Sequence, residues 1–270
     1  MRPALRGVGN LSLSACGAVL VTLPGAHYRI DQVHCDHWPA PLAHVGLWLL
    51  YLLGVALLSL GWLGMVSMLS REERAGAPRI SLGTVLGMGV LPHAIALFAP
   101  LFLSEDPLCY AAIGRAIAKF HADPHLPLRE GMPPGDPFLQ ILEPAWQRQP
   151  SAYSSGFHEI ARLVARIGGD DLGRQLRLYQ LIGLLSMLAV ACLSALAARR
   201  ARDQTDPSLG FERTLSPRAE GVRAAALVLF CPLAIIEGTL SAHNDGLLAV
   251  TVALAALFVV QGHRGLNHRS

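Results

Sequence analysis

The chain has 270 residues, of which 52% are hydrophobic and only 15% are charged, and its mean hydropathy is +0.41. Because soluble domains carry about 25% charged residues, this composition excludes a soluble enzyme, and it also excludes a disordered chain. The formal net charge of +3 is too small to indicate a polyanionic partner, which excludes a nucleic-acid-binding module.

Six apolar segments have the length that a helix needs to cross a bilayer. They lie near residues 8–25, 42–68, 80–103, 178–198, 222–239 and 246–262. The first segment is the weakest, but no A-x-A cleavage site follows it, so a retained span is favoured over a secretory signal. The sequence therefore predicts an all-α polytopic membrane protein with about six transmembrane helices.

The placement of arginine predicts the orientation of these spans. Outside the segment 104–177, every Lys or Arg except Arg29 lies at a terminus, after the second span, or between the fourth and fifth spans. The positive-inside rule makes that side cytoplasmic. We therefore expect a multi-pass protein of the cytoplasmic (inner) membrane with both termini cytoplasmic. Three spans lie in 1–103, an external segment covers 104–177, and three spans follow in 178–270.

The external segment contains two stretches with the apolar spacing of amphipathic helices. Over 107–120, apolar residues share one face and Arg115 and Lys119 lie opposite; over 157–167, Phe157, Val164 and Ile167 share a face. Both stretches are too short and too charged to span, so we expect two interfacial helices on the membrane surface. Between them, Trp146 and Tyr153 fit either membrane anchors or platforms on which sugars stack.

An acidic pair, Glu105 and Asp106, stands where the third span leaves the membrane. One interpretation is a helix cap. The other is a general base, because a carboxylate at the edge of hydrocarbon can take a proton from an attacking sugar hydroxyl. Tyr110 follows Asp106 by one helical turn on the same face, so the two side chains could line one site.

A second polar group, His243-Asn244-Asp245, opens the sixth span. A helix cap is again the simpler interpretation, but Glu237 adds a further ionisable residue at the outer edge of the bilayer, where such groups need partners. His243 could carry charge near neutral pH and contact a lipid phosphate. The predicted topology places this group on the same side as Asp106.

The sequence contains no nucleotide-binding signature and no metal-ligand spacing among its five cysteines. We expect no cofactor, although the acidic residues of the external segment leave a divalent ion open. Cys35 and Cys109 fall on one side of the membrane, which leaves a disulfide between them open. His93, inside the third span, is expected to be a hydrogen-bonded polar residue between helices.

Three runs resemble the polyprenol-phosphate-mannose-dependent α-1,6-mannosyltransferases of the GT-C superfamily of membrane glycosyltransferases. They are SEDPLCYAAIGRAIAKFHADPH (104–125), GDPFLQILEPAWQRQPSAYSS (135–155) and CPLAIIEGTLSAHNDGLLA (231–249). The resemblance implies transfer of a sugar, mannose by this likeness, from a polyprenyl phosphate donor to a glycan or glycolipid on the outer face of the membrane. It makes Asp106, with Glu105, catalytic. It makes Tyr110, Arg115, Tyr153, His243, Asn244 and Asp245 substrate-binding.

The chain also departs from the family pattern. Asp123-Pro124-His125 replaces the usual Asn-Pro-Tyr, and Tyr153-Ser154-Ser155 replaces Tyr-Gly-Pro, which leaves the sugar and the acceptor open. Family members usually have about twice as many spans, so the likeness covers an N-terminal half only, and a second polypeptide would complete the fold. The alternative is a non-catalytic membrane protein, either an inactive or split fragment of such an enzyme or a transporter-like subunit.

Overall fold

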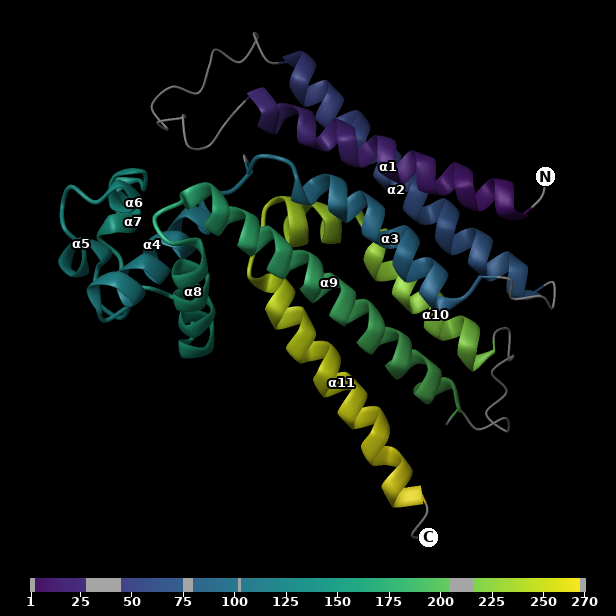
Figure 1. Cartoon of the computed structure of the whole chain (residues 1–270). Coiled ribbons are helices and arrows are strands. Elements are labelled where there is room, and N and C mark those ends of the chain that lie inside the picture. Colours follow the sequence, from purple (N-terminus) through teal and green to yellow (C-terminus); the bar gives the residue numbers. More distant parts are fainter. Residues whose placement is uncertain (1–2, 28–44, 75–79, 102, 204–215, 268–270) are drawn as a thin grey trace.

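The computed structural model describes residues 3–27, 45–74, 80–101, 103–203 and 216–267, and the regular elements in these ranges are all helices. The helices α1 (Pro3–His27), α2 (Val45–Arg74), α3 (Leu82–Leu97), α9 (Leu172–Asp203), α10 (Pro217–Leu229) and α11 (Asp245–Asn267) form an elongated bundle (Figure 1). Their directions alternate, so the start of α1 and the end of α11 both lie away from the α3–α4 connection (Figure 1).

The expected all-α fold is confirmed, whereas the number of spans is confirmed only in part. Among the described residues, α1, α2 and α9 are long and apolar enough to cross a membrane. The helix α3, with 16 residues, and the described apolar part of α11 are shorter. A fourth span exists if α10 and the following π-helical segment η4 (Ala234–Leu240) are counted together.

The fifth apolar segment is not one continuous helix, contrary to the prediction for 222–239. The helix α10 ends at Leu229, and η4 continues at an angle of 61° to it. Pro232 explains the break, because proline lacks a backbone N–H and disfavours helical backbone in the residue before it. After this break, the residues that follow η4 reach the start of α4, where His243 contacts Asp106.

Small residues and one buried histidine hold this bent segment in the bundle. A Cβ atom on Gly183 of α9 would lie 1.8 Å from the carbonyl oxygen of Gly238, so only glycine permits this approach. His93 of α3 is fully buried, with Nδ1 2.7 Å from the Thr239 hydroxyl and Nε2 3.2 Å from the Leu229 carbonyl oxygen. The prediction of a hydrogen-bonded interhelical histidine is confirmed.

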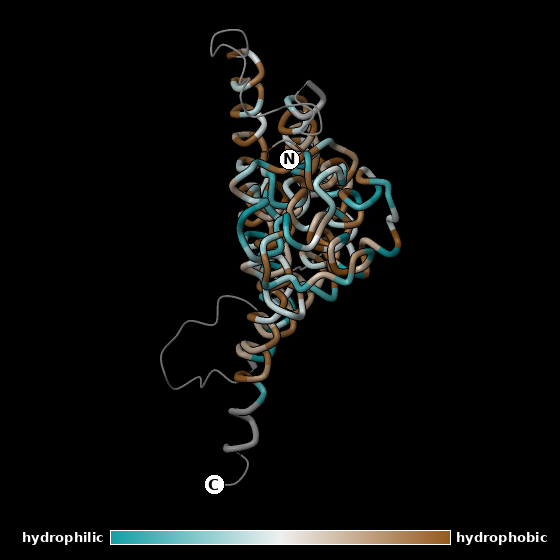
Figure 2. The backbone as a smooth tube through the Cα atoms, turned by 90° about the vertical axis from the view of Figure 1, so that its left-hand side faces the viewer, coloured by the Kyte–Doolittle hydropathy of each residue, from teal (hydrophilic) through white to brown (hydrophobic). Residues whose placement is uncertain are grey.

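Residues 104–169 fold into a separate unit at one end of the bundle (Figure 1), which we call the α4–α8 unit. It contains α4 (Asp106–Phe120), three one-turn helices and α8 (Ser155–Gly168). The one-turn helices are α5 (Leu128–Gly131), α6 (Pro137–Gln140) and α7 (Pro144–Gln147). Hydrophilic stretches gather in this unit, which faces the viewer in Figure 2.

Both helices expected in the external segment are present, but α4 does not lie on a surface. Residues Pro107–Ala116 are all buried, because α8 and the intervening loop pack over them. A Cβ atom on Gly114 would lie 2.3 Å from the Ala161 carbonyl oxygen, which shows how closely α8 approaches. The expected placement of Arg115 on the polar face of a surface helix is therefore wrong, since its side chain is buried. On α8, Phe157 and Val164 are buried, whereas Ile167 is 55% exposed.

Candidate functional site

The carboxylate of Asp106 is free of a capping role. The Asp106 backbone N–H donates to the Ser104 hydroxyl at 3.1 Å, and the side chain of Glu105, the N-cap residue of α4, forms no capping hydrogen bond. The side chain that bonds the backbone at the start of α4 is therefore that of Ser104, and the carboxylates of the acidic pair do not act as the cap. Asp106, at the first position of α4, is left to face the loop that joins η4 to α11.

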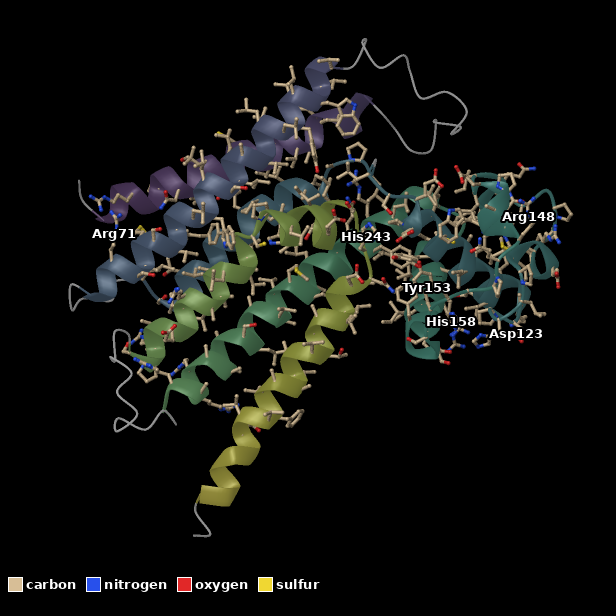
Figure 3. The ribbon with its side chains drawn as sticks, turned by 180° about the vertical axis from the view of Figure 1, so that it is seen from behind. Arg71, Asp123, Arg148, Tyr153, His158 and His243 are labelled. Atoms are coloured by element: carbon tan, nitrogen blue, oxygen red, sulfur yellow. The ribbon has the colours of Figure 1, made fainter. Side chains whose placement is uncertain are left out.

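A tight turn after η4 carries His243 to Asp106. Ala242 adopts left-handed backbone, with φ of 55°, and the His243 N–H donates to the Glu237 carbonyl oxygen at 3.0 Å. The turn reverses the chain, so that α11 can begin at Asp245. Two segments separated by more than 100 residues thus meet at the boundary between the bundle and the α4–α8 unit, as the position of His243 in Figure 3 shows.

The imidazole of His243 lies between two carboxylates. Its Nδ1 is 3.3 Å from Asp106 Oδ2, and its Nε2 is 3.5 Å from Glu237 Oε2. The hydrogen bond to Asp106, together with the charges of Asp106, Glu237 and Asp245, raises the pKa of His243 above its usual value, although partial burial opposes this. The protonated form of His243 is therefore favoured at this position.

The Tyr110 hydroxyl joins the same cluster from one turn further along α4. It lies 3.5 Å from Asp106 Oδ2 and 3.4 Å from Asn244 Oδ1, and it accepts from the Asn244 N–H at 3.4 Å. Burial is the main cause that raises the pKa of Tyr110 well above its usual range, so the hydroxyl stays neutral. We call Asp106, Tyr110, Glu237, His243 and Asn244 the acidic site.

An aromatic cluster holds Tyr110 in place. Its ring makes edge contacts with the rings of Tyr153, Phe157 and Tyr179, with centroid separations of 5.2, 4.8 and 5.5 Å. The Tyr179 hydroxyl donates to the Tyr110 carbonyl oxygen at 3.1 Å. The contacts come from the α4–α8 unit and from α9, so this cluster fixes the acidic site relative to the bundle.

Of the residues predicted from the sequence, the structure brings together Asp106, Tyr110, Tyr153, His243 and Asn244. Asp245 begins α11 beside them, and Glu105 adjoins Asp106. Arg115 does not join this group. Its Nε donates to both oxygens of the buried Asp136, at 3.0 and 2.8 Å, its Nη1 contacts Asp170, and its guanidinium lies over the Phe138 ring. A substrate-binding role for Arg115 has no support from these contacts.

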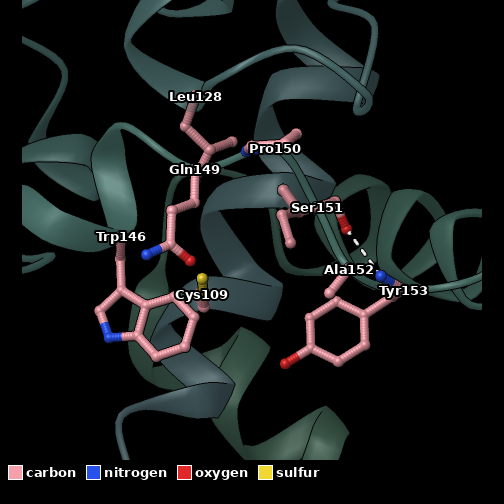
Figure 4. A pocket seen from close by; sticks show the side chains of 9 residues that line it. Cys109, Leu128, Trp146, Gln149, Pro150, Ser151, Ala152 and Tyr153 are labelled. Carbon is pink, nitrogen blue, oxygen red and sulfur yellow. Dashed lines mark hydrogen bonds between the residues drawn. The ribbon is translucent and has the colours of Figure 1, made fainter.

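A small pocket opens beside Tyr153. It has a cavity volume of about 40 Å³ and is lined by nine residues: Cys109, Ile113, Leu128, Trp146, Gln149, Pro150, Ser151, Ala152 and Tyr153 (Figure 4). Trp146 and Tyr153 thus line one concave surface. Burial raises the pKa of the Cys109 thiol to about 12. Cys35, its partner in the disulfide left open above, lies outside the described residues.

The sequence did not single out Tyr179 or Gln180, and Glu237 was noted only for its position. Gln180 is buried, and its amide donates to the carbonyl oxygens of Ala99 and Leu240 at 3.1 and 3.3 Å. A tyrosine and a glutamine within an otherwise apolar span are the signal that could have found them. Within the described ranges, no group of three His, Cys, Asp or Glu side chains is arranged to hold a metal ion.

A known protein family matches the chain over nearly its whole length. The family model described as "Alpha-(1->6)-mannopyranosyltransferase, N-terminal domain" matches residues 5–268. No curated protein and no solved structure matches the chain. The match includes the three runs from which the resemblance was drawn, and it refers to an N-terminal domain, in agreement with the expected half. The chain therefore belongs to the α-(1→6)-mannopyranosyltransferase family and corresponds to its N-terminal domain.

Proposed function

We propose that this chain carries the catalytic base of a membrane mannosyltransferase that uses polyprenyl phosphate mannose as the donor. The acceptor is a hydroxyl of a glycan or glycolipid, and the reaction takes place at the outer face of the cytoplasmic membrane. The observation that carries the proposal is the contact of Asp106 with His243 and Tyr110, which assembles the carboxylate and its partners from two distant segments.

In the proposed reaction, the acceptor hydroxyl oxygen attacks C1 of mannose and forms the new glycosidic bond. The bond between C1 and the phosphate oxygen breaks, and the lipid phosphate leaves with the electron pair. Asp106 takes the proton of the attacking hydroxyl, since a positioned carboxylate is suited to this task. One face of Asp106 is already engaged, because His243 and Tyr110 both contact Oδ2, which leaves Oδ1 for the acceptor.

His243 and Glu237 orient the base rather than transfer the proton. His243 bridges the two carboxylates through its two ring nitrogens, so the imidazole holds Asp106 at a fixed angle. The concave surface lined by Trp146 and Tyr153 supports an approach of the acceptor along it, because aromatic side chains offer apolar faces for sugar rings. The orientation at the outer face rests on the arginine distribution.

The test is a transfer assay with polyprenyl phosphomannose and a mannoside acceptor, run on purified chain and on membranes of the native host. Asp106→Asn is expected to lower the rate by about 10² to 10⁴-fold, the usual contribution of a general base. Glu143→Gln serves as the matched control, because Glu143 is exposed and its side chain forms no capping hydrogen bond. If Asp106→Asn transfers mannose in native membranes as fast as the unchanged chain, Asp106 is not the catalytic base.

A further inference from the structure

An open groove lies beside the start of α9, outside the acidic site. It has a volume of about 320 Å³ and is lined by Leu97, Phe98, Arg174, Arg177, Leu178 and Leu181. Four of these six residues are apolar and two are arginines. Such a combination is unusual next to a membrane span, since isolated charges near hydrocarbon need a partner or a function.

Both arginines have donor groups to spare. Arg177 uses only Nη1 for its contacts, which are the carbonyl oxygens of Leu97 and Ala99, both at 2.6 Å, and Gln180 Oε1 at 2.9 Å. Within the described part of the chain, the remaining guanidinium donors of Arg177 and the whole guanidinium of Arg174 have no hydrogen-bond or ion-pair partner. Two guanidinium groups one helical turn apart match the oxygens of a phosphate.

The apolar part of the groove continues along an exposed side of α9. Phe98 is 77% exposed, Leu181 is 38% exposed and Leu185 is 55% exposed. Arg177, Leu181 and Leu185 follow one another at intervals of four residues, which places them in one column on the helix. A ligand with a phosphate head and a long apolar chain therefore fits the column, with the head at Arg177.

The groove is linked to the acidic site by shared contacts. Gln180, which accepts from Arg177, donates to the Leu240 carbonyl oxygen at the end of η4, three residues before His243. Tyr179, the neighbour of Gln180 on α9, donates to the carbonyl oxygen of Tyr110. The same turn of α9, at Tyr179 and Gln180, therefore contacts both the groove and the segments that form the acidic site.

The acidic site itself cannot neutralise a phosphate. The group of this site that can carry positive charge, His243, already lies between the carboxylates of Asp106 and Glu237, and Asp245 adds a further negative charge nearby. A phosphodiester approaching this site needs positive charge from elsewhere, and Arg174 and Arg177 supply it from the connected groove.

We propose that this groove binds the polyprenyl phosphate part of the donor, with the phosphate on Arg174 and Arg177 and the prenyl chain along Leu181 and Leu185. The proposal rests on the proposed function and names the residues that hold its donor. As the bond between C1 and the phosphate oxygen breaks, negative charge grows on the phosphate, and the two guanidinium groups stabilise it.

The experiment measures binding of a sugar-free polyprenyl phosphate to the detergent-purified chain by native mass spectrometry. Arg174→Gln and Arg177→Gln are each expected to weaken binding about tenfold or more, the usual effect of losing a charged hydrogen bond. The control is Arg166→Gln, an exposed arginine of α8 outside the groove. Because Arg177 also binds two backbone carbonyls, thermal unfolding of each variant is measured, and Arg174→Gln tests the groove without that structural role.

Competing ligands distinguish the possible sources of the phosphate. We expect neither inorganic phosphate nor vesicles containing phosphatidylglycerol to displace the polyprenyl phosphate at equal concentration. Displacement by phosphatidylglycerol would overturn the proposal in favour of a general anionic-lipid site, and unchanged binding by Arg174→Gln would also overturn it. Asp106→Asn is expected to bind at least as tightly as the unchanged chain while it loses transfer, so a failure of the groove and a failure of the proposed base give different results.

Discussion

The helical bundle and the α4–α8 unit are stabilised in different ways. In the bundle, helices approach through small residues such as Gly183, and a few buried polar groups such as His93 are satisfied across helices. In the α4–α8 unit, a short buried helix is surrounded by loops, and the buried ion pair of Arg115 and Asp136 joins its parts. The acidic site draws Asp106 and Tyr110 from the unit and Glu237, His243 and Asn244 from the bundle, so its geometry depends on both.

The largest expected effect on stability comes from breaking the ion pair of the unit. Arg115→Met leaves the buried carboxylate of Asp136 without its partner, which costs about 3–5 kcal/mol of stability. We expect faster hydrogen exchange throughout the α4–α8 unit and unchanged exchange in α1 and α2. Hydrogen–deuterium exchange with mass spectrometry on the detergent-solubilised chain measures both.

Arg162→Met is the matched control for this substitution. Arg162 pairs with Glu159 on the more exposed surface of α8, and such a pair contributes less than about 1 kcal/mol. Equal acceleration of exchange by Arg115→Met and Arg162→Met would show that the buried pair does not organise the unit.

A smaller effect is expected from the buried histidine of the bundle. His93→Leu leaves the Thr239 hydroxyl and the Leu229 carbonyl oxygen unpaired between helices, which costs about 1–2 kcal/mol. A lower melting temperature of the purified chain, with normal exchange in α8, is the expected result. Thr251→Val is the control, since the Thr251 hydroxyl is exposed and donates within α11 to the Leu248 carbonyl oxygen. Equal melting of both variants would contradict the account of the bundle.

The smallest expected effect is a pH-dependent change in stability at the boundary between the bundle and the α4–α8 unit. Because the pKa of His243 is raised in the folded chain, its contact with Asp106 stabilises fully below the ordinary histidine value near 6.5. This contribution is lost as the pH rises through the raised value. Hydrogen exchange of residues 241–249, corrected for the intrinsic rate, should therefore accelerate from pH 6 to pH 9. The same peptide of His243→Gln should show no such change; a change of equal size would assign the effect to another group.

Much of the helical framework could be predicted from the sequence, because apolar runs and helix spacing are local signals. The helices over 107–120 and 157–167 were expected and are present. The burial of Arg115 could not be predicted, since its partner Asp136 comes from a loop whose path has no local periodicity. The break at Pro232 had a signal, because proline disfavours helix, but the count of apolar residues over 222–239 outweighed it.

The candidate site could be predicted in composition but not in geometry. The spacing along the chain put Asp106 and Tyr110 on one helix face, and the topology put His243 on the same side of the membrane. The contact between His243 and Asp106 depends on the bend before η4 and on the left-handed backbone of Ala242. Both are tertiary features, and Glu237 acquires its place beside His243 only through them.

The central claim is that Asp106 and His243 act as one unit in mannosyl transfer, and a double-mutant cycle tests it most directly. Initial transfer rates are compared for the unchanged chain, Asp106→Asn, His243→Gln and the double variant in native membranes. Residues that act as a unit give strongly non-additive losses, so we expect the double variant to be about as slow as Asp106→Asn alone. A double variant whose loss equals the product of the two single losses would contradict the claim.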